Sequence, residues 1–215
     1  MEDKTEPEKC ILDACCSGRE MWYNKHHPNC IYMDIREEEK GILKFRPNFE
    51  IKPDIVGDFT NLPKEIKERN FKLIVWDVPH FKARKLTGEM LKKYGGLHPE
   101  TWQSDLKKGF NELWSVLEDY GILIFKFSDY HIKFNKMMSL FPHKPLFYNY
   151  GNTSNKSTTK WFCFMKIPIA KSKTQGASPS FNKGLEVSAT PSPKSPTATS
   201  PNPNIMFNKS EGLQC

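Results

Sequence analysis

The chain has 215 residues, of which 38% are hydrophobic and 27% charged, a composition typical of a globular protein with a polar surface. Its formal charge of +7 and pI of about 9.0 favour an anionic partner such as nucleic acid, although lysine-rich surfaces also occur on proteins without one. No stretch approaches the roughly 18 apolar residues of a membrane-spanning helix, and the N-terminus, MEDKTEPEK, lacks the apolar segment of a secretory signal. We therefore expect a soluble, cytoplasmic protein without a membrane partner.

The cysteines indicate a reducing compartment. Six are scattered along the chain, and three of them lie within or beside apolar runs. This usage is typical of buried thiols rather than of a disulfide framework. The segment HHPNC, residues 26–30, has no second ligand pair at zinc spacing, so no metal site is expected.

Four short apolar runs in the first half of the chain each lead to an aspartate. They lie within Lys9–Gly18 (KCILDACCSG), Cys30–Asp34 (CIYMD), Ile55–Asp58 (IVGD) and Phe71–Asp77 (FKLIVWD). The last run is continuous rather than alternating in polarity, which is what a strand covered on both faces requires. The four runs predict strands of a parallel sheet.

The second half of the chain alternates helix and strand signals. An amphipathic helix is predicted for Thr101–Asp119, where apolar residues recur at steps of three and four. Gly121–Phe127 predicts a strand, and His131–Phe141 predicts a helix ended by Pro142. The segments PLFYNY and TKWFCFMKI flank the turn-rich GNTSNKS and predict an antiparallel hairpin.

This order of elements predicts an α/β fold with about seven strands in a mostly parallel sheet, helices on both faces and a closing antiparallel hairpin. Beyond residue 168 the chain is rich in Pro, Ser and Thr, and such a segment cannot bury enough apolar surface to offset its ordering entropy. We expect a flexible N-terminus over residues 1–8, a core-forming domain over 9–168 and a disordered tail over 169–215. The tail would bind a partner or serve as a passive linker.

Asp13, Asp34, Asp58 and Asp77 follow the four predicted strands. Because the carboxyl ends of parallel strands lie along one edge of a sheet, these carboxylates are expected to line one crevice. Asp34 lies 21 residues after Asp13, close to the roughly 20-residue offset at which a second-strand acid reaches a ribose diol. Each aspartate taken singly could equally cap the next helix or turn. All four together favour a binding site.

The turn after the first run argues against phosphate-binding sites. It holds one glycine, Gly18, so the GxGxxG fingerprint is absent, and the chain has no GxxxxGK[ST] motif. Dinucleotide and nucleoside triphosphate sites are therefore disfavoured.

The ordered motifs DACCSG, YMD, GDFTNLP, FKLIVWDVPH and GILIFKFSD resemble those of the class I S-adenosylmethionine-dependent methyltransferases. The chain is similar to short phage and bacterial stand-alone enzymes whose fourth motif reads Asp-Pro-Pro-His. More distantly, it resembles the nucleic-acid amino-methyltransferases with Asp/Asn-Pro-Pro-aromatic. The resemblance covers roughly Lys9 to Pro168, and it implies a Rossmann-like class I methyltransferase fold with S-adenosyl-L-methionine as cofactor.

The resemblance also implies which residues bind the cofactor. Asp13 and the turn that follows it would approach the methionine part, Asp34 would bind the ribose hydroxyls, and Asp58 with Phe59 would recognise the adenine. The implied cofactor residues are Asp13, Ala14, Cys15, Cys16, Gly18, Asp34, Asp58 and Phe59.

The same resemblance implies that Asp77, Pro79 and His80 form the catalytic motif. An exocyclic amino group of a base is a poor nucleophile because its lone pair is delocalised into the ring. The Asp77 carboxylate and the next backbone carbonyl can accept its two N–H groups and localise that lone pair for in-line attack on the sulfonium methyl. His80 could stack on the base or help to remove the proton. Val78 replaces the first proline of the family pattern, which keeps the carbonyl but loses the ring that fixes φ.

The expected function is methyl transfer to an amino nitrogen of a DNA or RNA base, and a base in duplex DNA would have to be flipped out to reach Asp77. The segment Phe81–Glu100 is either a mobile basic loop over the site, suited to a polyanion, or an ordinary solvated loop. The alternatives are methylation of a small molecule or protein, and an inactive relative that binds cofactor or nucleic acid as a module.

Overall fold

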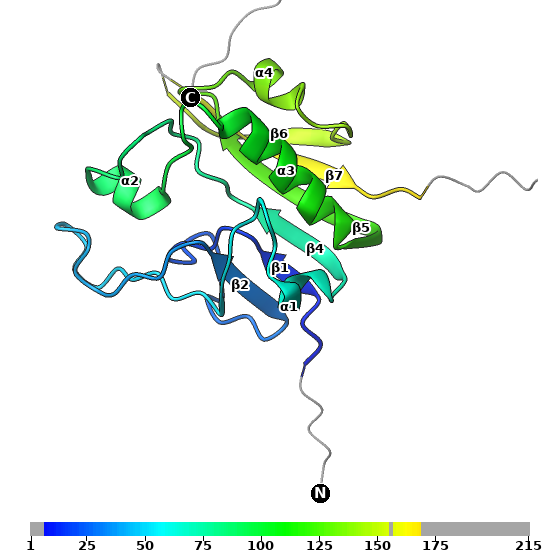
Figure 1. The fold of residues 1–215 in the computed structure, drawn as a ribbon, viewed down its shortest axis with the longest axis horizontal. Helices are drawn as coiled ribbons and strands as arrows, with labels where there is room; N and C mark the ends of the chain where they lie inside the picture. The colour runs from blue at the N-terminus through cyan, green and yellow to red at the C-terminus, as the bar shows by residue number, and fades with distance from the viewer. Residues whose placement is uncertain (1–6, 155–156, 169–215) are drawn as a thin grey trace, which may run out of the picture. The chain divides into compact units, whose positions relative to one another are not determined.

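The structure, a computed structural model, describes residues 7–154 and 157–168, which belong to one compact unit, Met1–Lys171. Seven strands form a single sheet (Figure 1). Their bounds are β1 Ile11–Asp13, β2 Cys30–Asp34, β3 Ile55–Val56, β4 Phe71–Trp76, β5 Leu117–Ser128, β6 Phe147–Thr153 and β7 Thr158–Met165. The predicted tail, 169–215, and most of the predicted flexible N-terminus, 1–8, lie outside the described residues.

The sheet has the strand order β3-β2-β1-β4-β5-β7-β6. Strands β1 to β5 run parallel, and β7 is antiparallel to both β5 and β6. In the middle of the sheet, Leu12 of β1 pairs with Ile31 on one side and Ile74 on the other. This is the α/β fold with a mostly parallel seven-stranded sheet that the sequence predicts, and β6 and β7 form the predicted hairpin.

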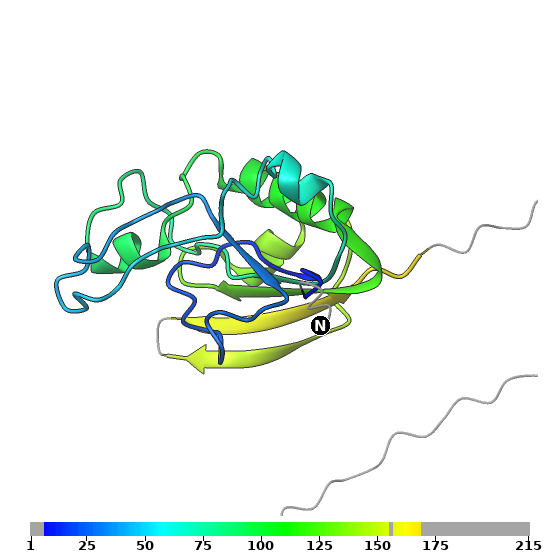
Figure 2. The same cartoon turned by 90° about the horizontal axis from the view of Figure 1, so that it is seen from below.

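The described helices are α1 Lys64–Lys67, α2 Glu89–Tyr94, α3 Trp102–Ser115 and α4 Phe134–Met138. Helices α1, α3 and α4 pack on one face of the sheet, because Ile66, Phe110 and Met137 share a core cluster with Leu123 and Phe125 of β5 (Figure 2). Side chains alternate between the faces of a strand. All five residues therefore lie on the helical face.

The opposite face of β1 and β2 has a different cover. There, Cys30 and Tyr32 pack against Trp22, which lies in a segment without helix. Helices were expected on both faces, but in the described part of the chain this face is covered by irregular backbone. Ser17 and Arg19 adopt φ of 45° and 55°, in the left-handed region, which interrupts a helix after β1.

The boundary between α3 and β5 also differs from the expected one. The predicted helix Thr101–Asp119 ends at Ser115, and Leu117 already pairs with Phe71 in the sheet. The helix was predicted too long because Leu117, the first residue of β5, also fits the helical spacing of apolar residues. Tyr120, with φ of 62°, accompanies a register shift in the pairing of β4 with β5. The helix predicted over His131–Phe141 is confined to α4.

The aromatic core fixes α3 on the sheet. The fully buried Phe110 stacks on Phe141 and Trp114, with ring centroids 4.4 and 5.4 Å apart. Trp76 of β4 is also fully buried and contacts Phe125 at 4.8 Å. These contacts hold the ends of β4 and β5, from which the site described below is built.

The described cysteines are all free thiols, as the sequence predicts, and Cys16, Cys30 and Cys163 are buried. None of the helices within residues 7–154 and 157–168 is long and apolar enough to cross a membrane.

Candidate active site

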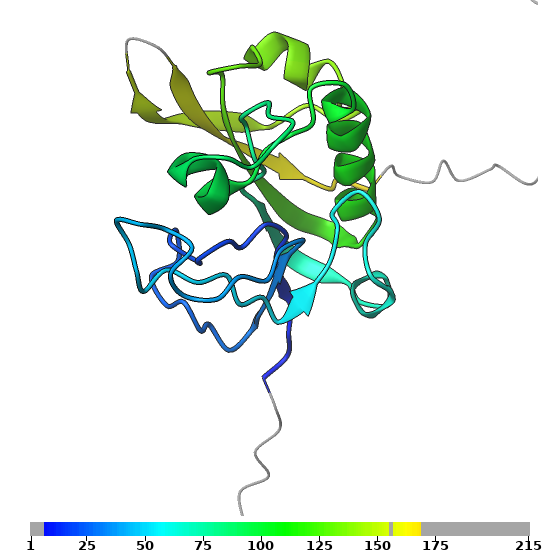
Figure 3. The same cartoon turned by 60° about the vertical axis from the view of Figure 1, so that its left-hand side comes forward.

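A cavity of about 600 Å³ opens beyond the carboxyl ends of β1 to β4. The turns that follow these strands form its floor, and the segment around α2 lies over the same end of the sheet (Figure 3). Most of the predicted site residues line it. They are Ala14, Cys15, Cys16, Gly18, Asp34, Asp58, Phe59, Asp77 and Pro79. Asp13 and His80 do not.

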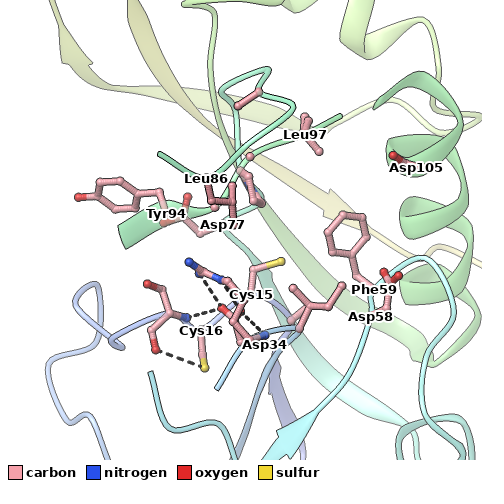
Figure 4. A pocket seen from close by; sticks show the side chains of 18 of the residues that line it. Cys15, Cys16, Asp34, Asp58, Phe59, Asp77, Leu86, Tyr94, Leu97 and Asp105 are labelled. Carbon is pink, nitrogen blue, oxygen red and sulfur yellow. Dashed lines mark hydrogen bonds and ion pairs between the residues drawn. The ribbon is translucent and has the colours of Figure 1, made fainter. Parts of the chain in front are cut away.

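Asp34 ends β2 and is almost fully buried, with an exposed fraction of 4%. Its Oδ2 accepts a hydrogen bond from the Ser17 backbone N–H at 2.9 Å, and its Oδ1 accepts from the Arg36 backbone N–H and Nε at 3.0 and 3.1 Å. The carboxylate therefore ties the first turn to the chain after β2 (Figure 4). Arg36 Nη2 also donates to Oδ2, at 3.4 Å, so the roughly four lone-pair positions of the carboxylate are engaged and a hydroxyl group would have to replace this long contact.

Asp58 and Phe59 line the other side of the cavity, after β3. Asp58 Oδ1 accepts from the Thr60 backbone N–H at 2.8 Å, which orders the turn. The Phe59 ring meets Trp76 edge-on at 5.5 Å. It lies over Gly109 of α3, where a Cβ would come within 2.5 Å of the ring. The glycine thus makes room for an aromatic wall of the cavity.

Asp77 directly follows β4 and forms an ion pair with Lys126 of β5. The Lys126 ammonium lies 2.6 Å from Asp77 Oδ2, and the two side chains are 18% and 24% exposed. Burial raises the pKa of Asp77, and the lysine opposes this rise. The two residues therefore form a partly desolvated ion pair in the lining of the cavity.

The rest of the fourth motif divides between the cavity and the core. Pro79 lines the cavity, whereas the side chain of Val78 is buried in the core. His80 packs against Phe81 and Phe127 at 4.5 and 6.4 Å. Burial, with Lys126 and His131 nearby, lowers the pKa of His80 to about 4. At neutral pH His80 is an uncharged ring and a weak base.

The first turn contributes backbone and small side chains to the floor. Burial raises the pKa of both Cys15 and Cys16, so neither thiol is a thiolate at neutral pH. Gly18 lines the cavity, but a Cβ on it would lie 2.5 Å from the Phe49 ring. The close packing of Phe49 therefore explains why position 18 is a glycine.

Asp13 is placed differently from the other three aspartates. It is fully buried, accepts from Trp22 Nε1 at 2.6 Å and from the Cys15 backbone N–H at 3.2 Å, and does not line the cavity. Burial raises its pKa to about 7. In this structure Asp13 supports the turn from beneath rather than facing a ligand.

The segment Phe81–Glu100 is more ordered than a solvated loop. Its ends pair through Lys82 and Leu97, and Arg36 Nη1 donates to the carbonyl of Lys92 at 2.8 Å. Ser17 Oγ donates to the carbonyl of Lys93 at 2.8 Å. The C-terminal end of α2 is thus fastened to the turns that follow β1 and β2.

The cavity lining includes charged residues that were not predicted from the sequence, among them Lys126, Arg36 and Asp105. Lys126 could have been identified from the sequence, because it is the one charged residue inside the apolar run GILIFKF. Arg36 and Asp105 could not have been identified in this way, since each belongs to a polar stretch in which charged residues are usual.

Comparison with known proteins gives limited information. No protein-family model and no curated protein matches the chain. Among solved structures, the chain is similar to the N-methyltransferase NodS from Bradyrhizobium japonicum WM9, with 11% identity and a TM-score of 0.45 over 74% of this chain and 85% of NodS. It is also similar to SMU.776, a candidate methyltransferase solved with SAH, with 12% identity and a TM-score of 0.45 over 75% of this chain and 46% of that one. At these values the likeness concerns the path of the chain alone.

Proposed function

We propose that the chain is an S-adenosyl-L-methionine-dependent methyltransferase that methylates an exocyclic amino nitrogen of a nucleic-acid base. The observation that carries the proposal is the convergence of Asp34, Asp58 and Asp77 from three parallel strands on one cavity. In open α/β sheets, ligands bind beyond the carboxyl ends of the strands. The cavity volume of about 600 Å³ lies within the range of roughly 300–1,000 Å³ for small-molecule sites.

The residues present fit the cofactor. Asp34 offers acceptors for a ribose diol, shared with Arg36. Asp58 offers an acceptor for the adenine amino group, and Phe59 offers a ring face or edge to the adenine. The turn from Ala14 to Gly18 would hold the methionine part. When bound, S-adenosyl-L-methionine supplies an electrophilic methyl group.

In the proposed mechanism, Asp77 orients the acceptor. Its Oδ1 accepts one amino N–H, while the Val78 carbonyl accepts the other, so that the nitrogen lone pair points at the methyl carbon. Lys126 holds Oδ2 and lowers the pKa of Asp77 against the effect of burial. As the N–C bond forms and the S–CH3 bond of the bound cofactor breaks, with its electron pair left on the thioether sulfur, the surplus amine proton would pass to Asp77, whose raised pKa favours accepting it. His80 lies outside the cavity and would shape the wall behind Pro79.

The function is tested by binding and then by transfer. Calorimetry with S-adenosylhomocysteine should detect one site, and no binding at millimolar ligand would contradict the proposal. Transfer of labelled methyl to mixed DNA, RNA, peptides and small amines, followed by nucleoside analysis, then identifies the acceptor. Binding without transfer to any of them would favour an inactive module, the alternative that Val78 leaves open.

Replacing Lys126 with Met should lower methyl transfer at neutral pH by about a hundredfold. Methionine keeps the length of the side chain but removes the cation that opposes the effect of burial, so the pKa of Asp77 should rise further. The acidic limb of the rate profile should therefore move to higher pH. The measurement is kcat against pH, with Lys64→Met on the exposed face of α1 as control. An unmoved profile would exclude this role for Lys126.

Replacing Gly109 with Ala should weaken cofactor binding by about tenfold. The new Cβ would lie 2.5 Å from Phe59 and 2.9 Å from Trp76, and overpacking of this kind costs about 1–3 kcal/mol. Helix propensity alone would instead stabilise the variant by about 1 kcal/mol. Calorimetry and thermal unfolding measure the two effects, with Lys108→Ala at an exposed position of α3 as control. A more stable variant with unchanged binding would show that Phe59 does not contact the cofactor.

A further inference from the structure

The last quarter of the described chain, residues 130–168, has a charge pattern that the proposed site does not use. Residues 130–168 contain six lysines and no Asp or Glu, a formal charge of +6, whereas residues 1–129 hold 21 basic and 23 acidic residues, a formal charge of −2. This basic segment forms α4, β6 and β7. A polyanion is the partner that such a segment attracts.

Exposed aromatic rings accompany the lysines on the hairpin. Tyr148 and Tyr150 of β6 are 49% and 59% exposed, with ring centroids 5.9 Å apart. Lys160 of β7 pairs with Tyr150, and its Nζ lies 4.1 Å from the Tyr148 centroid and 4.8 Å from the Tyr150 centroid. We call Tyr148, Tyr150 and Lys160 the hairpin platform.

Packing accounts for only part of this arrangement. Tyr148 contacts the buried Phe162 at 5.8 Å, and Lys160 Nζ also lies 4.7 Å from the Phe134 centroid. Tyr150 and the outer part of Tyr148 nevertheless remain exposed. β6 is the edge strand of the sheet, and residues 147–150 are all exposed. Lys160 forms no ion pair with any carboxylate in residues 7–154 and 157–168. Edge strands usually carry charges or proline instead of exposed rings, because bare apolar edges promote aggregation.

The platform lies at the same end of the sheet as Asp77. Lys160 pairs with Phe127 of β5, the residue after Lys126, and Lys126 binds Asp77. Neighbouring strands are about 4.8 Å apart, so β6 lies roughly 10 Å from β5 across this edge. Because successive side chains alternate between faces, Lys160 lies on the α4 face with Phe127, and Lys126 points to the other face. A ligand on the hairpin platform would therefore pass around the carboxyl end of β5 to reach the cavity.

We propose that the hairpin platform binds an unpaired nucleic-acid strand and directs one of its nucleotides to Asp77. Free rings beside lysines stack on base faces and attract phosphates, without a requirement for sequence. In a duplex the base faces are already covered, so the platform selects single strands. This inference rests on the proposed function only in taking nucleic acid as the methyl acceptor.

The test is fluorescence anisotropy of the full chain without cofactor, using labelled single-stranded DNA and RNA of about 20 nucleotides and the corresponding DNA duplex. The wild type should bind single strands at least about tenfold more tightly than the duplex. The double replacement Tyr148→Ala with Tyr150→Ala should weaken single-strand binding by about tenfold or more. Lys160→Gln should reduce the dependence of binding on salt by about one phosphate contact. The DNA and RNA arms show which strand is preferred.

Matched controls separate the platform from general effects. Tyr120 is 66% exposed near the start of β5, at the opposite end of that strand from the partner of Lys160, and Tyr120→Ala should bind like the wild type. Equal binding of duplex and single strand, or unchanged binding by the tyrosine double variant, would overturn the proposal. So would sedimentation showing that these tyrosines hold two copies of the chain together. Platform-dependent binding without methyl transfer would reject the proposed function alone, and transfer without platform dependence would reject this inference alone.

Discussion

Replacing Asp77 with Asn should lower methyl transfer by about 10³-fold while changing the affinity for S-adenosylhomocysteine by less than a fewfold. The size is that expected when a positioned polar group is lost from a reaction centre. Asparagine keeps the shape of Asp77 but presents an amide in place of a carboxylate, so it can neither pair with Lys126 nor take the proton. Single-turnover transfer and calorimetry measure the two quantities.

A control for Asp77→Asn must separate a loss of folding stability from a loss of methyl transfer. The variant leaves Lys126 partly buried without its carboxylate partner, which destabilises a protein by itself. The double variant Asp77→Asn with Lys126→Met removes both charges and should recover thermal stability without recovering transfer. Equal losses of transfer and cofactor affinity in the folded single variant would place Asp77 in the cofactor site instead.

Asp13 should make the chain less stable as the pH rises from about 4 to about 7. In the unfolded chain this carboxyl titrates near 3.8, whereas burial raises its pKa to about 7 in the fold. Between these values the folded state holds one proton more than the unfolded state, so the stability contributed by Asp13 falls as pH increases. At about 1.4 kcal/mol per unit, the difference amounts to roughly 4 kcal/mol.

The variant Asp13→Asn isolates this contribution. The free energy of unfolding in urea is measured for both proteins from pH 4 to pH 8. The wild-type value minus the variant value should decrease by about 4 kcal/mol across this range. Other titrating groups are common to both proteins and cancel. A difference that does not change with pH would show that Asp13 is solvated or ionised throughout, contrary to its burial beneath Trp22.

Local pattern was sufficient for most of the fold. The runs that became β2 and β4 were recognisable because burial demands uninterrupted apolar residues. Helix α3 was recognisable from its period, but its end was not, since Leu117 satisfies both the helical spacing and the strand that follows. The helix α2 was not predicted, because it buries no residue and so leaves no apolar period.

The hairpin platform likewise combines one feature that is visible in the sequence with one that only the fold supplies. The absence of acids from 130–168 is visible in the sequence, but the net charge of the whole chain conceals it. Only the antiparallel pairing of β6 and β7 brings Lys160 between Tyr148 and Tyr150. Cross-strand neighbours are distant in sequence, so no local pattern records them.

The sequence by itself determined the order of the elements, the edge of the sheet that carries the aspartates, and the candidate roles of Asp34, Asp58 and Asp77. The tertiary structure alone decided which carboxylates face the cavity. Asp13 still lies within β1, paired with Tyr32 and Val75, and its side chain points to the face covered by Trp22. Asp34 and Asp77 lie two residues beyond Tyr32 and Val75, the partners of Asp13, so they share its face of the sheet but lie farther toward the carboxyl edge, where the cavity opens. The register of β4 against β5 likewise aligned Lys126 with Asp77, a contact between residues 49 apart that no local pattern specifies.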